Sequence, residues 1–472
     1  MIRLFLKFSA GSWLAAAISL LTTPIVTALI VPDEFGRASM YILALNLLLQ
    51  VVMLGLDQSF ARRFYSDPSL EHRSRLLWNA MLPPLGLSVL VALAILWFGS
   101  PISRLLIGAE SDILIWLLAL SVVVAVLERF ALLVLRMNKE AVRFSMLRLA
   151  FAIINFLVIL LYCQFVARDF LAIVSANLAA LSLCAALAIL MGGPIWKAWP
   201  LDRALIGAML RYGLPFVPTF LAAWMFEGID RVALRHYSTF FELGLFSAAI
   251  KIVAILSLLQ IAFSNFWVPV SYELYESGSD EARATYASVF SQISGSLFVA
   301  GLGIIVLKDV VILLFDPAYR GAASIMPFLL LIPIMATLSE VTVVGINFRN
   351  RTHWHLYIAL GCAALNLILN LLLVPSLGAK GAAIATGFSY IAFFYSRTLM
   401  SARLFPIPVD LKRVHIAVIL FVLVAALNSF LPFSPLSYGA AAAAILAMLL
   451  IDRRIFLGLA TDLAGRIRRS AA

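Results

Sequence analysis

The chain has 472 residues, of which 63% are hydrophobic and only 12% are charged. A soluble globular protein is about 45–50% apolar and about 25% charged, so this composition excludes an ordinary soluble fold. The net charge of +11 would suggest a nucleic-acid partner in a soluble protein. Here the basic residues lie in short segments between apolar runs, and we expect no nucleic-acid binding.

The apolar runs are long enough to cross a bilayer as α-helices. A helix rises about 1.5 Å per residue and needs about 20 residues to cross roughly 30 Å of hydrocarbon. About fourteen segments meet this criterion. In chain order they are 9–31, 38–60, 76–98, 113–135, 147–166, 170–191, 213–235, 244–268, 287–307, 323–346, 355–374, 381–403, 414–431 and 435–451.

The first span follows Arg3 and Lys7 and resembles a signal peptide superficially. It is too long for the apolar region of such a peptide and further spans follow it, so we interpret it as a retained membrane helix. If the N-terminus is inside, most of the 35 Lys and Arg residues fall in the inner segments. This bias matches the positive-inside rule. It predicts an even number of spans, with both termini cytoplasmic and the basic loops at anionic membrane lipids.

Short motifs repeat between the two halves of the chain. Glu34-Phe35-Gly36 recurs as Glu242-Leu243-Gly244, and Asn155 has a counterpart in Asn366. Six predicted spans separate each pair, so the two repeats share one orientation, as in transporters built from parallel repeats. We therefore expect an all-α polytopic membrane protein with two six-helix bundles. The expected lobes are residues 1–200 and 201–405, followed by two additional helices and a basic cytoplasmic tail in 406–472.

The clearest candidate for a binding residue is Lys251, which lies well inside its span. A charge in hydrocarbon costs about 2.5–3.5 kcal/mol on insertion scales. Lys251 is therefore either a point charge for an anionic substrate or half of a structural ion pair. Glu227 and Arg231 lie one helical turn apart and either neutralise each other or serve the substrate. Asp230 is placed to pair with Lys251 from the preceding helix, or to titrate during ion-coupled transport.

Other polar and helix-bending residues are weaker candidates. Asp57 is predicted near the inner end of the second span, and Glu340 lies several residues inside the tenth with no basic neighbour on its own helix. Both are candidates for ion coupling or charge balance. The prolines Pro24, Pro215 and Pro218 fall within spans, where each removes a backbone hydrogen bond and permits a bend that can act as a hinge.

No sequence motif indicates catalysis. The chain has no Walker loop, no Gly-x-Ser-x-Gly and no zinc-ligand spacing. Its longest predicted outer loop, 99–112, is too short for an enzymatic module. We therefore expect no enzyme, no cofactor and no metal, and an ion gradient or the membrane potential as the energy source.

Three stretches carry more specific patterns. They are Val31-Pro32-Asp33-Glu34-Phe35-Gly36 with Gly55-Leu56-Asp57-Gln58-Ser59-Phe60-Ala61-Arg62, then Arg211-Tyr212-Gly213-Leu214-Pro215 with Asp230-Arg231 and Glu242-Leu243-Gly244-Leu245-Phe246, and lastly Asn366 and Asn370 with Gly378-Ala379-Lys380-Gly381. In this order and spacing, from about residue 9 to 403, the chain resembles the bacterial polysaccharide flippases. These are the O-antigen and exopolysaccharide translocases of the multidrug/oligosaccharidyl-lipid/polysaccharide exporter superfamily. Phe246 departs from the pattern, since relatives often have tyrosine there.

The resemblance implies a MATE-like fold of twelve core helices with two added. It also implies transport of an isoprenoid-diphosphate-linked oligosaccharide to the outer leaflet for lipopolysaccharide or exopolysaccharide synthesis, driven by H⁺ or Na⁺ exchange. Lys251 and Arg231 would receive the diphosphate, Asp230 and Glu227 would balance them, and polysaccharide polymerase and glycosyltransferases would be partners.

The sequence leaves two alternative functions open. One is a cation-coupled multidrug exporter of the same superfamily. The other is a membrane enzyme of polysaccharide assembly, such as a polymerase or ligase, which usually needs a larger outer loop than this chain has.

Overall fold

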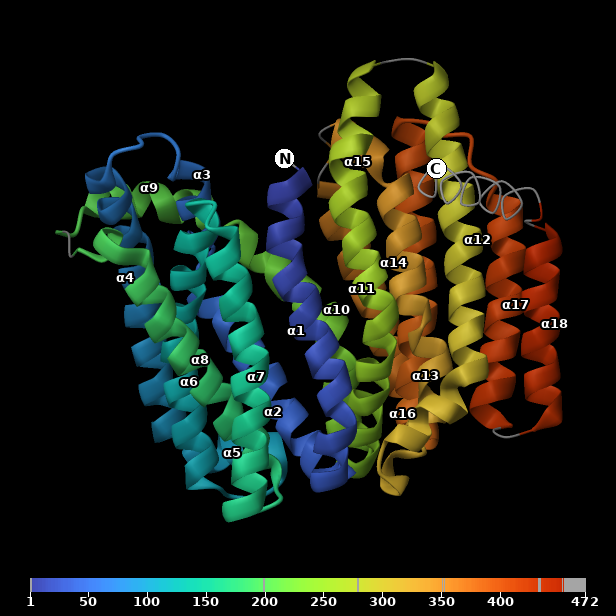
Figure 1. The fold of residues 1–472 in the computed structure, drawn as a ribbon, viewed down its shortest axis with the longest axis horizontal. Coiled ribbons are helices and arrows are strands. Elements are labelled where there is room, and N and C mark those ends of the chain that lie inside the picture. Colours follow the sequence, from blue (N-terminus) through green and yellow to red (C-terminus); the bar gives the residue numbers. More distant parts are fainter. Residues whose placement is uncertain are drawn as a thin grey trace, which may run out of the picture. The chain divides into compact units, whose positions relative to one another are not determined.

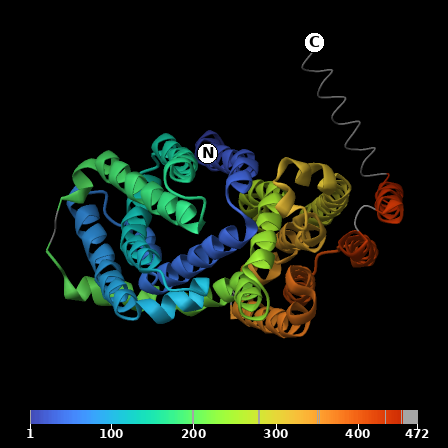
Figure 2. The ribbon, with the colours of Figure 1, turned by 90° about the horizontal axis from the view of Figure 1, so that it is seen from below.

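The computed structural model describes residues 2–197, 200–277, 280–349, 351, 353–431, 434–451 and 453. Side chains are described outside 2–12, 262, 265, 269, 276–277 and 280–283. The predicted basic tail lies outside the described residues except for Arg453. Within the described residues every regular element is a helix, as Figures 1 and 2 show, which confirms the all-α prediction.

The chain packs as two compact units, residues 1–247 and 248–472. The boundary between the units lies within a helix and differs from the predicted lobe boundary at residue 200, which stays a prediction about the repeats. The first unit contains α1 (Ile2–Leu29), α2 (Pro32–Val52), α3 (Leu56–Arg63), α4 (Leu70–Trp97), α5 (Gly99–Ile107), α6 (Asp112–Met137), α7 (Ala141–Phe165), α8 (Phe170–Gly192), η1 (Gly193–Trp196), α9 (Arg203–Gly213), α10 (Phe216–Tyr237) and the start of α11 (Phe240–Ser277).

The second unit continues from α11. It contains α12 (Asp280–Val311), η2 (Ile312–Leu314), η3 (Pro317–Tyr319), α13 (Ala322–Leu329), α14 (Leu331–Thr342), α15 (Val344–Phe348), α16 (His353–Leu404), α17 (Leu411–Phe430) and α18 (Pro435–Ile451).

Side-chain caps fix where several helices begin. The Ser69 hydroxyl accepts from the His72 backbone N–H at the start of α4, and Ser111 does the same at the start of α6. The carboxylates of Asp169 and Asp202 cap α8 and α9. Each cap satisfies backbone donors that have no partner within the helix, so the short polar connections set the helix boundaries.

Each unit is a bundle of neighbouring helices. In the first unit α6 packs against α4 and α8, and α7 packs against α1 and α8 (Figure 1). In the second unit α16 packs against α13 and α14, while α18 packs against α12 and α17 (Figure 2). A polar contact anchors α18, because the Tyr438 hydroxyl donates to the Asp309 carboxylate, which also pairs with the buried Lys308 ammonium.

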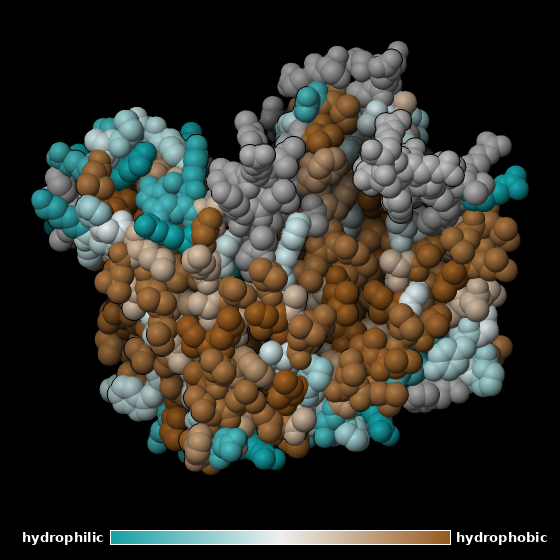
Figure 3. Space-filling model, viewed as in Figure 1, coloured by the Kyte–Doolittle hydropathy of each residue, from teal (hydrophilic) through white to brown (hydrophobic). Residues whose placement is uncertain are grey.

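The helices have the length and composition of membrane spans. Among the described residues ten helices are long and apolar enough to cross a membrane, or up to eleven if the bent pair α9–α10 forms one span. One of these is α16, a 52-residue helix that contains two of the predicted spans. Two shorter apolar helices, Trp13–Leu29 and Pro435–Ile451, match the first and last predictions. Figure 3 shows hydrophobic side chains around the middle of the helices and hydrophilic ones at the ends.

Two predicted spans, 38–60 and 213–235, have breaks that the hydropathy pattern did not reveal, and a kink lies in the connection predicted between two others. The predicted span 38–60 ends as a helix at Val52 and resumes as α3, because Gly55 adopts a left-handed backbone (φ 67°). The seventh predicted span is the pair α9 and α10, bent by 42°. The two spans predicted within α16 are joined by a kink at Gly378 (φ 54°, ψ −132°).

Candidate functional site

Charged side chains interrupt the apolar sequence of α10. Asp230 is buried, with 3% of its surface exposed, whereas Arg231 is half-buried and Glu227 is exposed. None of the ion pairs found among the described residues joins Glu227 to Arg231. Arg231 Nε is buried without a hydrogen-bond partner in the described part of the chain. Glu227 and Arg231 therefore make no direct ion pair here, their mutual neutralisation stays a prediction, and the guanidinium keeps unused donor capacity.

A glycine brings this segment of α10 against α2. A Cβ added at Gly228 would lie 2.9 Å from Leu43 Cδ1. One turn earlier, the Trp224 indole N–H donates to the Leu43 backbone carbonyl over 3.3 Å. These contacts fix the rotation of α10 in the first unit, and with it the directions of its charged residues.

Lys251 lies on α11 in the second unit. Its side chain is exposed, while its neighbours Ile252 and Val253 are 1% and 3% exposed and face the core. Lys251 is therefore on the side of α11 that does not face the core of the second unit. The pairing of Lys251 with Asp230 stays a prediction.

Asp57 connects α3 to α6. Its side chain is buried, and its carboxylate accepts from the Gln58 backbone N–H at 2.9 Å and from Arg129 Nη2 at 3.0 Å. The sequence placed Asp57 at the end of a continuous span near Arg62 and Arg63. A local pattern could not reveal its partner, because Arg129 is 72 residues away. The contact makes Asp57 a structural anchor, and its role in ion coupling stays a prediction.

The break that precedes Asp57 packs against the break between α9 and α10. A Cβ added at Gly55 would lie 2.2 Å from the Gly213 carbonyl oxygen, and one added at Gly213 would lie 2.7 Å from the Leu54 carbonyl oxygen. A side-chain carbon at these distances would overlap with backbone atoms, so only glycine fits at either position. Two stretches that carry the family resemblance thus meet in space.

The repeated motifs at the starts of α2 and α11 also meet. A Cβ added at Gly36 would lie 2.2 Å from the Phe240 carbonyl oxygen, and one added at Gly244 would lie 1.9 Å from the Pro32 carbonyl oxygen. The two helices therefore touch backbone to backbone at the positions where the sequence repeats itself. On the predicted topology this contact faces the outer side.

Aromatic and cationic side chains surround this contact. The Phe240 ring lies between the guanidinium groups of Arg37 and Arg235, at 5.2 Å and 4.7 Å from the ring centroid. Arg235 also donates to the backbone carbonyls of Arg104 and Leu105 at the end of α5, over 2.9 Å and 3.1 Å. The cluster ties α2, α5, α10 and α11 together at one end of the first unit.

Glu340 has a basic partner that the sequence did not reveal. Arg397 Nη1 on α16 lies 3.4 Å from Glu340 Oε1 on α14. Their side chains are 11% and 29% exposed, respectively. Arg397 lies within the predicted span 381–403, and its place inside an apolar run was a signal of burial.

The three predicted hinge prolines differ in their surroundings. Pro24 lies inside α1, which continues through it as one helix. Pro215 lies at the 42° bend between α9 and α10, and Pro218 lies in the first turn of α10. The bend coincides with the Gly213 contact, so Pro215 is the best placed of the three for a hinge.

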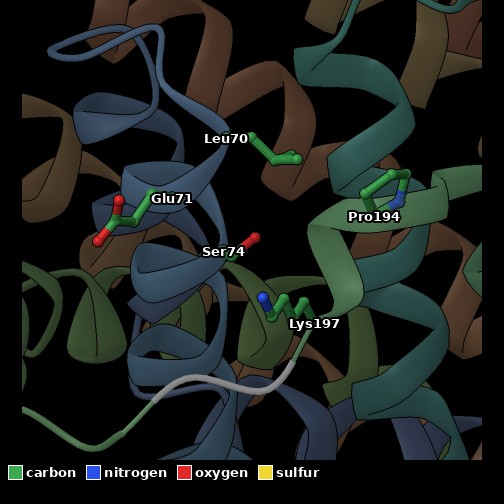
Figure 4. A pocket seen from close by; sticks show the side chains of 5 residues that line it. All are labelled: Leu70, Glu71, Ser74, Pro194 and Lys197. Carbon is green, nitrogen blue, oxygen red and sulfur yellow. The ribbon is translucent and has the colours of Figure 1, made fainter.

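A surface groove opens between the first turns of α4 and η1 (Figure 4). It has a volume of about 670 Å³ and is lined by Leu70, Glu71, Ser74, Pro194 and Lys197. Glu71 points away from Lys197, and the Lys197 ammonium lies beside Ser74 (Figure 4). The groove contains none of the predicted site residues.

Two solved structures with similar folds cover most of the chain. One is the lipid II flippase MurJ in an inward closed conformation, with a TM-score of 0.70 at 14% identity, covering 95% of this chain and 98% of that chain. The other is an inward-facing multidrug resistance MATE family transporter of the MOP superfamily, with a TM-score of 0.64 at 14% identity, covering 84% and 94%. These similarities establish the fold and confirm the predicted MATE-like architecture.

Sequence comparison gives a more specific relation. An uncharacterized membrane protein of Methanocaldococcus jannaschii is 28% identical over 196 residues, which are 40% of this chain and 38% of that protein. Residues 25–316 match the model of a family described as polysaccharide biosynthesis protein. This range contains the first two of the three motif stretches, and it confirms the predicted family. The chain is a multi-pass membrane protein that belongs to the polysaccharide biosynthesis protein family.

Proposed function

We propose that this protein moves an isoprenoid-diphosphate-linked oligosaccharide from the inner to the outer leaflet of the bacterial inner membrane, for O-antigen or exopolysaccharide synthesis. The observation that carries the proposal is a set of cationic side chains on membrane helices of a polysaccharide biosynthesis protein. Lys251 is exposed on α11, and Arg231 on α10 keeps an unpaired Nε. Both have the charge that a diphosphate requires.

Each charged residue has a proposed part in this cycle. Lys251 and Arg231 attract the diphosphate, while Asp230 and Glu227 balance their charge when no cargo is bound. Because an isolated charge in hydrocarbon is costly, a carboxylate nearby makes the empty state tolerable. An H⁺ or Na⁺ gradient supplies the energy, and both termini are cytoplasmic. The polysaccharide polymerase and glycosyltransferases act on the same lipid-linked chain.

The glycine contacts of the first unit are compatible with an alternating-access mechanism. The contact between Gly36 and Gly244 closes the end predicted to face outward, and the contact between Gly55 and Gly213 lies beside the bend at Pro215. Backbone contacts without interlocking side chains can separate and re-form without rotamer changes. We infer that release of the cargo requires the starts of α2 and α11 to separate.

Replacing Lys251 tests the proposal. In a strain deleted for the native gene, Lys251→Ala should lower surface polysaccharide by at least about tenfold, because hydrogen bonds to charged groups contribute about 1.5–3 kcal/mol. Lys251→Arg should retain part of the activity, and Lys412→Ala, at an exposed position of α17, is the matched control. Normal polymer at normal protein levels in Lys251→Ala would remove this residue from the mechanism.

A small-molecule exporter is the second candidate, since the fold also occurs in multidrug transporters. Proteoliposomes separate the two functions. The flippase should move a fluorescent lipid-linked oligosaccharide across the bilayer and confer no drug resistance on a sensitised host. Drug resistance without lipid movement would favour the exporter. Collapsing the H⁺ gradient and the Na⁺ gradient in turn identifies the coupling ion.

A further inference from the structure

The helix α14 is enclosed by the second unit except along one stripe. In the span Ala322–Thr342, 89% of the apolar window that identifies it as a membrane span is buried, a larger share than in any other span of the described residues. Within Leu331–Thr342 only Ile332, Ala336 and Glu340 are not buried. These positions recur every fourth residue and lie on one face of α14. Glu340 is the last of them, so the partly exposed stripe ends at a carboxylate.

Arg397 faces this carboxylate from α16. Its side chain is 11% exposed, its Nε has no hydrogen-bond partner among the described residues, and its guanidinium lies 4.8 Å from the Phe393 ring centroid. The distance of 3.4 Å to Glu340 is longer than the 2.7–2.9 Å typical of a charge-assisted hydrogen bond. The pair therefore leaves much of the guanidinium's donor capacity unused.

The backbones around the pair are held in place. The hydroxyls of Thr342 and Thr398 share a hydrogen bond of 2.7 Å, and the Gly345 backbone N–H donates to the Ser401 hydroxyl at 2.9 Å. Arg397 precedes Thr398 in the chain, so its backbone is held, whereas the Glu340 side chain is 29% exposed and more accessible than the guanidinium that it faces. A fixed cation beside a displaceable carboxylate is the arrangement that an exchanging anion needs.

We propose that Arg397 is a further binding residue for the diphosphate of the cargo, and that Glu340 occupies its guanidinium until the cargo arrives. This inference rests on the proposed function and adds a residue of the second unit to it. A diphosphate presents two oxygens to the planar fork of arginine, which Glu340 does not do at 3.4 Å. Glu340 is thus a competitor of the anion, and not a second ligand.

Binding of farnesyl diphosphate to the full chain in detergent, measured by calorimetry with farnesol as the uncharged comparison, tests this inference. Arg397→Gln should weaken binding by about tenfold or more, and Arg397→Lys should weaken it less. Glu340→Gln should strengthen binding several-fold, because the competing charge is gone. Arg104→Gln, which removes a cation from an exposed ion pair with Glu110, should leave affinity unchanged.

The direction of the Glu340→Gln effect distinguishes a binding role from a structural one. If the pair only holds α14 to α16, Glu340→Gln and Arg397→Gln will lower thermal stability alike and Glu340→Gln will not raise affinity, and the inference is wrong. If Arg231→Gln weakens binding while Arg397→Gln and Glu340→Gln leave it unchanged, the inference fails and the proposed function stands. If the wild type does not distinguish farnesyl diphosphate from farnesol, both fail.

Discussion

Gly36 faces Gly244 so closely that a Cβ on Gly36 would lie 3.0 Å from the Gly244 backbone nitrogen. The two glycines belong to motifs that the sequence repeats at the starts of α2 and α11. At this contact the repeated motifs bring the backbones of α2 and α11 together.

Replacing Gly244 with alanine should destabilise the protein. Alanine normally stabilises a helix by about 1 kcal/mol relative to glycine, but here the added Cβ would lie 1.9 Å from the Pro32 carbonyl oxygen. We expect a net loss of about 1–3 kcal/mol, typical of overpacking. Thermal unfolding in detergent measures it.

The matched control is Gly361→Ala on α16, where an added Cβ meets nothing within 4 Å. It should leave stability unchanged or raise it. Equal stabilisation by Gly244→Ala and Gly361→Ala would show that α2 and α11 do not touch as described.

Replacing Phe240 with alanine should loosen the same end of the first unit. The ring lies between Arg37 and Arg235, and each cation–π contact contributes about 0.5–2 kcal/mol. Without the ring two like charges face each other. We expect a loss of about 1–3 kcal/mol in unfolding free energy, a smaller loss for Phe240→Trp, and an intermediate one for Phe240→Leu. A loss for Phe240→Leu no larger than that for Phe240→Trp would mean that packing volume, and not the aromatic face, stabilises this end.

A double-mutant cycle should detect coupling between Asp57 and Arg129. The carboxylate is buried but Arg129 is 53% exposed, so solvent screening limits the coupling to about 0.5–1 kcal/mol. Asp57→Asn and Arg129→Gln together should therefore cost less than the sum of the single changes. Additive losses in chemical unfolding would mean that the contact contributes nothing.

The cap of α9 should depend on pH. The Leu205 backbone N–H and then the Arg75 guanidinium hold the pKa of Asp202 below its usual range. A carboxyl group with a lowered pKa contributes stability above its unfolded-state pKa and loses it as the pH falls through its folded-state pKa. Wild type should exceed Asp202→Ala in melting temperature from roughly pH 5 to 8, and the difference should shrink below about pH 4.

Asp202→Asn separates the two interactions in this cap. Asparagine also accepts from backbone donors at a helix start but does not pair with Arg75 as an ion. It should fall between wild type and Asp202→Ala at neutral pH. A melting-temperature difference that grows on acidification would contradict the assigned role of Asp202.

Hydropathy by itself determined the all-α class and the order of the apolar helices, because each apolar run must satisfy its own backbone hydrogen bonds in lipid. The motifs identified the family. The break at Gly55 escaped, because a glycine in an apolar run has the same hydropathy whether its φ is negative or positive, whereas the kink at Gly378 lies in the connection predicted between two spans.

Only the tertiary structure decided the partners of the charges. Asp57 pairs with Arg129 and Glu340 with Arg397, in both cases across helices far apart in the sequence. A local pattern tests only neighbours three or four residues apart, such as Glu227 and Arg231, and therefore cannot find such partners. Which face of a helix opens and which is enclosed depends on the packing of the whole unit, and that packing separates the exposed Lys251 from its buried neighbours.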